Sequence, residues 1–147
     1  MATNPQVPQG TLNKLRASVM WSAFPTLNVT PPFLGEEMIR LSFEGDSTVF
    51  INTATGAVTS QEPYLVATIR MHLLRSQPLA ELYKAKMEGD SQIGEAVVRP
   101  DSSQMSPWQL NNCAIMNVEP MDFTGKAPAY MVSVRGYYNV NSNLWNF

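Results

Sequence analysis

Apolar and polar residues alternate in steps of two along most of this chain, which is the pattern of half-buried β-strands. The clearest alternation runs over residues 64–75. One face of this segment would be apolar, with Leu65, Ala67, Ile69, Met71 and Leu73. The opposite face is mixed, with Tyr64, Val66, Thr68, Arg70 and His72. Further strands are predicted over 15–22, 38–43, 95–99, 109–119 and 129–140.

Residues 47–60, "STVFINTATGAVTS", carry no charge and predict a β-hairpin that turns near Thr55-Gly56. A long uncharged hairpin in water would invite aggregation through its apolar surface. We therefore expect region 44–62 to contact a neighbouring subunit, as we also expect of the two termini. The candidate inter-subunit residues are Val49, Phe50 and Ile51 in this region, and Trp145 and Phe147 at the C-terminal end.

The period changes in "HLLRSQPLAELYKAKMEGD", residues 72–90, where apolar residues fall three and four apart. This spacing predicts one short helix over about 76–88, with Ser76 as its N-cap and Gly89 at its end. Such a short helix needs tertiary packing to be stable. The predicted sheet-facing stripe contains Leu79, Leu82, Tyr83 and Met87. The predicted outward face contains Glu81, Lys84 and Glu88.

The 147 residues suit a single domain, 1–147, and the fold class predicted is mostly β. We expect an antiparallel β-sandwich or barrel-like domain that carries the one short helix. Residues 1–13 are polar and contain two prolines, so they predict an extended N-terminal arm. The tail 141–147 ends in Trp145 and Phe147, which are predicted to dock either on their own domain or on a neighbouring subunit.

Charged residues make up only 15% of the chain and hydrophobic residues 44%. This charge content is below the usual quarter, so part of the surface is expected to be covered by copies of the chain or by partners. The net charge of −2 argues against a basic nucleic-acid-binding surface. The single cysteine fits a reducing compartment. No signal peptide and no membrane insertion are expected, because no window approaches 18 apolar residues.

Few residues in the sequence could carry chemistry. His72 lies on the mixed face of its predicted strand without a marked orienting partner, and Cys113 is predicted to be a small buried hydrophobe. The carboxylates are scattered, the glycines stand singly, and zinc-ligand spacing is absent. We expect no enzyme activity, no cofactor and no metal site.

Three segments together resemble a known family. They are "VATIRMHLLRSQPLAELYKAKME" (66–88), "MSPWQLNNCAIMNVEPMDF" (105–123) and "YMVSVRGYYNVN" (130–141). They are similar to the tail tube proteins of contractile-tailed, myovirus-type bacteriophages, in which a strand runs through Ser-x-Pro into the only helix. The resemblance covers roughly residues 36–141. One departure is Leu74-Arg75-Ser76, where the family has Lys-Thr-Ser.

The resemblance implies a structural virion protein that forms hexameric rings stacked into a tail tube. The inner strands of six subunits would join into one continuous β-barrel. The implied partners are copies of the chain, the tail sheath protein, and the baseplate or tube initiator and terminator proteins. Viral DNA would pass through the lumen without specific binding. Localisation in the phage tail, after assembly in the host cytoplasm, is also implied.

A lumen for DNA should carry more acidic than basic residues, because basic side chains would hold the phosphates. The mixed face of 64–72 and the loop carboxylates Glu44, Asp46 and Glu62 are the candidate lumen residues. Arg70 would need a neighbouring carboxylate if it reached the lumen, and otherwise it would belong to a subunit interface.

The alternative function is a soluble β-sandwich module that binds a carbohydrate or a peptide. Such a module would need an exposed aromatic platform or a concave polar cleft. Trp21, Trp108 and Trp145 are the candidate platform, although each is expected to be packed instead.

Overall fold

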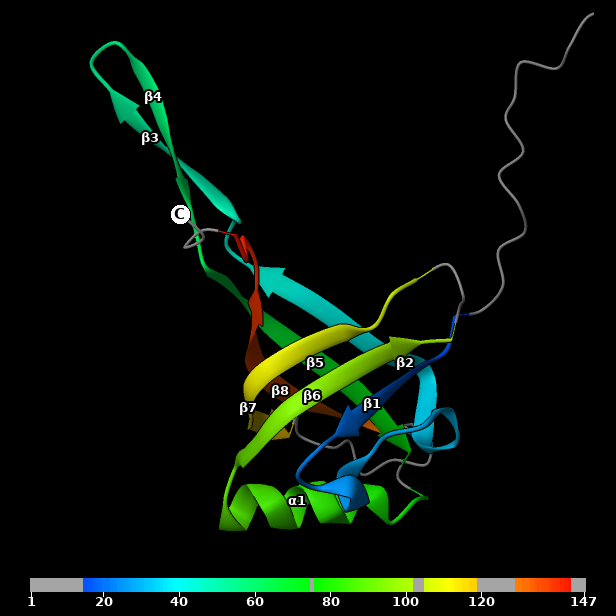
Figure 1. Cartoon of the computed structure of the whole chain (residues 1–147). Coiled ribbons are helices and arrows are strands. Elements are labelled where there is room, and N and C mark those ends of the chain that lie inside the picture. Colours follow the sequence, from blue (N-terminus) through cyan, green and yellow to red (C-terminus); the bar gives the residue numbers. More distant parts are fainter. Residues whose placement is uncertain (1–14, 75, 102–104, 119–128, 144–147) are drawn as a thin grey trace, which may run out of the picture.

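The computed structural model describes residues 15–74, 76–101, 105–118 and 129–143, without the side chains of 36, 37, 129 and 130. It is a curled antiparallel sheet of six strands, in the order β1-β6-β7-β8-β5-β2 (Figure 1). These strands are β1 (Ala17–Trp21), β2 (Leu34–Glu44), β5 (Tyr64–Leu74), β6 (Gln92–Pro100), β7 (Trp108–Val118) and β8 (Ala129–Asn139). The fold class predicted from the alternating pattern is confirmed: the domain is mostly β, half-barrel in shape, with one α-helix.

The core lies on the inner side of the curl. Ala67, Ile69, Met71 and Leu73 of β5 are buried there, as the alternation predicts. The rings of Phe43 on β2 and Trp108 on β7 are 5.4 Å apart, although two strands separate β2 from β7 in the sheet. The curl therefore brings side chains from distant strands into contact on its inner side.

The helix α1 (Leu79–Gly89) closes one end of the curled sheet (Figure 1). It begins three residues later than predicted, and the residue at its N-cap is Pro78. No side chain caps this helix by a hydrogen bond, so the prediction of Ser76 as N-cap is wrong. Glu81, Lys84 and Glu88 are exposed.

The buried face of α1 is rotated from the predicted one. Leu79, Ala80 and Tyr83 are buried, whereas Leu82 is 45% exposed. The prediction that Leu82 faces the sheet is therefore wrong. The physical reason is the anchoring of Tyr83. Its hydroxyl donates a hydrogen bond to the carbonyl oxygen of Leu27 at 2.6 Å and accepts one from Nε1 of Trp21 at 2.8 Å.

Residues between β1 and β2 supply part of this anchor. They form two short 3-10 helices, η1 (Pro25–Leu27) and η2 (Pro31–Phe33), and Leu27 and Val29 are buried. Val19 and Val29 exchange both backbone hydrogen bonds, at 2.9 and 2.8 Å. This segment between the two strands therefore belongs to the core.

A separate two-stranded hairpin, β3 (Thr48–Thr53) and β4 (Gly56–Gln61), projects from the end of the sheet far from α1 (Figure 1). Thr53 pairs with Gly56, so the turn is where the sequence predicts it. In the part of the chain described, no helix is long and apolar enough to cross a membrane.

Candidate functional site

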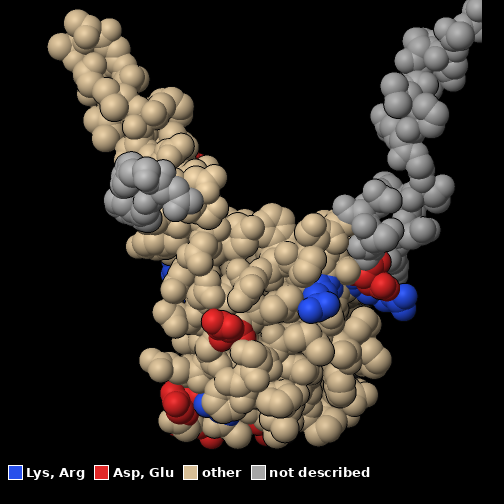
Figure 2. All heavy atoms as spheres, viewed as in Figure 1, with Lys and Arg blue, Asp and Glu red and all other residues tan. Residues whose placement is uncertain are grey.

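The hairpin, which we call the hairpin arm (Thr48–Gln61), exposes large apolar side chains to solvent. Phe50 is 67% exposed and Ile51 54%, and Val49 and Val58 are exposed as well. The arm contains no charged residue and extends away from the domain as an uncharged projection (Figure 2). Of the residues predicted to contact a neighbouring subunit, Val49, Phe50 and Ile51 therefore lie on the arm, whereas Trp145 and Phe147 lie outside the described residues.

Hydrogen bonds fix the base of the arm to the end of β8. Nδ2 of Asn141 donates to the carbonyl oxygens of Ser47, at 2.9 Å, and Glu62, at 2.7 Å. The backbone N–H of Glu62 donates to the carbonyl oxygen of Ser47 at 2.9 Å. These bonds tie the arm to the sheet at its base, where the candidate lumen residues Asp46 and Glu62 both lie.

The outward side of β2, β5 and β8 forms a second surface, which we call the polar face. It carries Arg40, Ser42 and Glu44 from β2, Thr68 and Arg70 from β5, and Ser133 and Arg135 from β8. Thr68 and Ser133 are only 5% and 4% exposed although they point away from the core. Larger neighbouring side chains must therefore cover these two residues.

Arginines dominate the charge of the polar face. Glu44, a candidate lumen residue, forms an ion pair with Arg135. Arg40 lies directly opposite Arg70 in the β2–β5 register. Within one copy, the described side chains of the polar face are thus more basic than acidic. This balance is the reverse of the one expected for a lumen wall.

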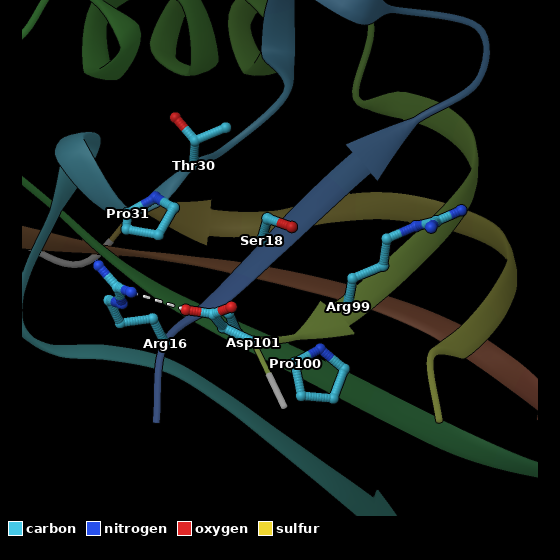
Figure 3. Close-up of a pocket in the computed structure, with 8 residues that line it drawn as sticks. Arg16, Ser18, Thr30, Pro31, Arg99, Pro100 and Asp101 are labelled. Carbon is cyan, nitrogen blue, oxygen red and sulfur yellow. Dashed lines mark ion pairs between the residues drawn. The ribbon is translucent and has the colours of Figure 1, made fainter. Parts of the chain in front are cut away.

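A shallow polar hollow of about 360 Å³ lies beside β1 (Figure 3). Arg16 and Asp101 form an ion pair of 2.9 Å there, and Arg99 extends away from this pair (Figure 3). The remaining polar side chains of the lining are the hydroxyls of Ser18 and Thr30. No histidine, thiol or unpaired carboxylate lines this hollow among the residues described, so it offers these hydroxyls no base.

An apolar hollow of about 300 Å³ lies at the end of the domain opposite α1, lined by residues such as Leu41, Val98 and Trp108. Beside it, the rings of Phe43, Trp108 and Tyr138 pack together with centroid distances of 5.2 to 5.6 Å. Trp108 is therefore packed and Trp21 is buried, whereas Trp145 is not described. Neither described tryptophan offers an exposed platform for a sugar or a peptide.

Cys113 and His72 are the two residues of the sequence considered as possible catalytic groups. Cys113 is buried, and burial raises the pKa of its thiol to about 12. Nδ1 of His72 lies 3.2 Å from the carbonyl oxygen of Met38. No group of three or more histidine, cysteine, aspartate or glutamate side chains that could hold a metal ion occurs in the described part of the chain.

The charge pattern of the polar face could be predicted only in part. Alternation places Arg40, Arg70 and Arg135 on the outward sides of their strands, but only the strand register brings Arg40 and Arg70 opposite each other.

No known protein family matches this chain, and no curated protein matches it either.

Proposed function

We propose that this protein is a structural subunit that assembles with copies of itself into stacked hexameric rings, the tail tube of a contractile-tailed bacteriophage. The observation that carries the proposal is the hairpin arm. Its exposed phenylalanine, isoleucine and valines cannot be buried by the chain's own sheet, because the arm projects away from it. A second copy supplies the missing cover.

The sheet supports the same proposal. Its two edge strands, β1 and β2, each have one hydrogen-bonded neighbour in the six-stranded sheet. An open edge is a template for pairing with another chain. Strands joined between six copies form a continuous barrel, and the rings stack around a channel through which viral DNA passes without specific binding.

The remaining surfaces receive roles within this proposal. The exposed side of α1, with Glu81, Lys84 and Glu88, faces away from the channel toward the tail sheath protein. The baseplate or tube initiator and terminator proteins contact the first and last rings. Glu44, Asp46 and Glu62 remain the candidate acidic residues of the channel, and localisation in the virion follows from the assembly.

Electron microscopy and analytical ultracentrifugation of the purified protein test this function. The unsubstituted protein is expected to form rings of six copies, or tubes with the width of one such ring. The double variant Phe50→Ser, Ile51→Ser should remain folded but monomeric, because it removes the apolar cover that assembly buries.

The matched control is Leu82→Ser, which removes an exposed leucine from α1 and should leave assembly unchanged. A parent chain that stays monomeric at high concentration contradicts the proposal. If the Phe50→Ser, Ile51→Ser variant assembled normally, the hairpin arm would not be part of the contact between copies.

A further inference from the structure

The pair Arg40 and Arg70 is an unusual feature of the polar face. The two residues are exposed and directly opposite each other on β2 and β5, and neither forms an ion pair with a described residue. Like charges in directly opposite positions of an antiparallel pair repel each other. The pair therefore raises the free energy of the isolated chain unless an anion neutralises it.

None of the carboxylates whose side chains the structure describes neutralises this pair. Glu44 lies four residues from Arg40 on β2, a separation of about 13 Å along the strand, and it is already paired with Arg135. Asp46 and Glu62 lie beyond the end of β2, at the base of the hairpin arm, and form no ion pair with a described side chain. Among the described side chains, one copy thus carries a basic site and an acidic site that have no ion-pair partner.

From this arrangement we infer that a second copy of this chain docks with its Asp46 and Glu62 against Arg40 and Arg70. The inference rests on the proposed self-assembly. The guanidinium groups bind carboxylates through two parallel, charge-assisted hydrogen bonds, which add specificity to the contact. Because the two sites differ, the contact is head-to-tail, so that every copy donates one site and receives the other.

The contact also changes the charge that a channel wall presents. The polar face of one copy is basic, and the two carboxylates of the neighbouring copy neutralise Arg40 and Arg70. DNA phosphates then meet a wall without unpaired arginines, and sliding is not slowed by counterion release. The channel's charge balance is therefore a property of the assembly and is absent from the single chain.

Charge reversal tests the contact. Arg40→Glu, Arg70→Glu should raise the concentration at half-assembly at least tenfold in 50 mM salt, and so should Asp46→Arg, Glu62→Arg. All four changes in one chain should return it to within threefold of the parent, because the complementary charges are restored. The matched control Lys84→Glu, on the exposed side of α1, should also stay within threefold.

A cysteine pair gives a second measurement, of whether the two sites lie side by side in different copies, made at a protein concentration at which the cysteine variant still assembles. Asp46→Cys with Arg70→Cys should form disulfides between copies, which appear as a ladder on a non-reducing gel. A bridge within one chain is excluded because the two positions are separated by well over the roughly 7 Å that a disulfide spans. Each single cysteine variant should give no ladder.

The outcomes separate the inference from the proposed function. If the parent chain does not associate, both are wrong. If the parent assembles but neither reversal changes assembly, or if the cysteine pair gives no ladder, only the inference is wrong. If Arg40→Glu, Arg70→Glu assembles normally but loses binding of a 30-base-pair DNA duplex that the parent retains, the arginines contact phosphates and the inference is likewise overturned.

Discussion

The two ends of this domain contrast in how they treat their apolar side chains. At the helix end, α1 buries Leu79, Ala80 and Tyr83 against the sheet, and the hydroxyl of Tyr83 is bonded to both Trp21 and Leu27. At the opposite end, the hairpin arm leaves Phe50 and Ile51 mostly in solvent. One end of the domain thus buries its apolar side chains within the chain, whereas the other end leaves them exposed to solvent.

This contrast separates folding from assembly. Burial of apolar area is the main favourable term in folding, and the helix end completes that burial within one copy. The hairpin arm contributes little to the burial of apolar area on folding and instead exposes apolar area that association can bury. Substitutions at the helix end should therefore change the free energy of unfolding, whereas substitutions in the arm should change self-association.

The largest effect is expected at Tyr83. Tyr83→Phe removes the hydroxyl and leaves two buried polar groups, the Trp21 N–H and the Leu27 carbonyl, without this partner. Each such loss costs about 1–3 kcal/mol, so the two together should lower the free energy of unfolding by roughly 2–6 kcal/mol. Urea unfolding of the variant measures this. The control is Tyr64→Phe, because Tyr64 is exposed. If both substitutions changed the free energy of unfolding equally little, Tyr83 would not anchor the helix.

Gly136 on β8 should be the next most sensitive position. A Cβ at this residue would lie 2.5 Å from Sγ of Cys113 and 2.9 Å from the carbonyl oxygen of Asn111, so β7 and β8 must separate to admit it. Gly136→Ala should cost roughly 1–3 kcal/mol, as overpacking does. Thermal unfolding measures this cost.

Gly56→Ala is the matched control for this prediction, because a Cβ at Gly56 meets nothing within 4 Å. Adding Cys113→Ala to Gly136→Ala should recover part of the lost stability, since the sulfur contact is removed while the Asn111 contact remains. A Gly136→Ala variant as stable as the control would mean that the two strands yield without strain.

Alkaline pH should weaken the fold through the buried thiol. The folded-state pKa of Cys113 is raised to about 12 by burial, so above about pH 9 the unfolded chain loses this proton and the folded chain keeps it. Stability contributed by this group is present below pH 9 and declines at up to about 1.4 kcal/mol per pH unit toward pH 12.

Urea midpoints at pH 8, 9 and 10 check this prediction, with Cys113→Ala as the comparison. Burial also raises the pKa of Tyr83, but that tyrosine begins to contribute only above about pH 10. The variant should therefore show a flatter decline between pH 9 and 10. Parallel curves for the two proteins would exclude the thiol as the cause.

The smallest effect on folding is expected in the hairpin arm. Phe50→Ser should change the free energy of unfolding of the monomer by less than about 0.5 kcal/mol, as exposed substitutions usually do. Chemical unfolding at low protein concentration provides the measurement. A loss of several kcal/mol would show that the arm packs on its own domain, and the contrast between the two ends would disappear.

Alternation and turn residues determined most of this fold. The period of two identified the strands and the buried face of β5, because side chains on a strand point to opposite sides in turn. The uncharged segment with its Thr55-Gly56 turn identified the hairpin, and the change of period identified the helix. These are local properties, so they can be read without knowing which segments meet.

Tertiary structure decided the rest, because it depends on contacts between residues far apart in the chain. The rotation of α1 follows from the bonds of Tyr83 to Trp21 and Leu27, 62 and 56 residues away, and it leaves Leu82 exposed. The opposition of Arg40 and Arg70 likewise requires the β2–β5 register. A strand pattern gives the face of each arginine, but only the pairing of strands sets the distance between their charges.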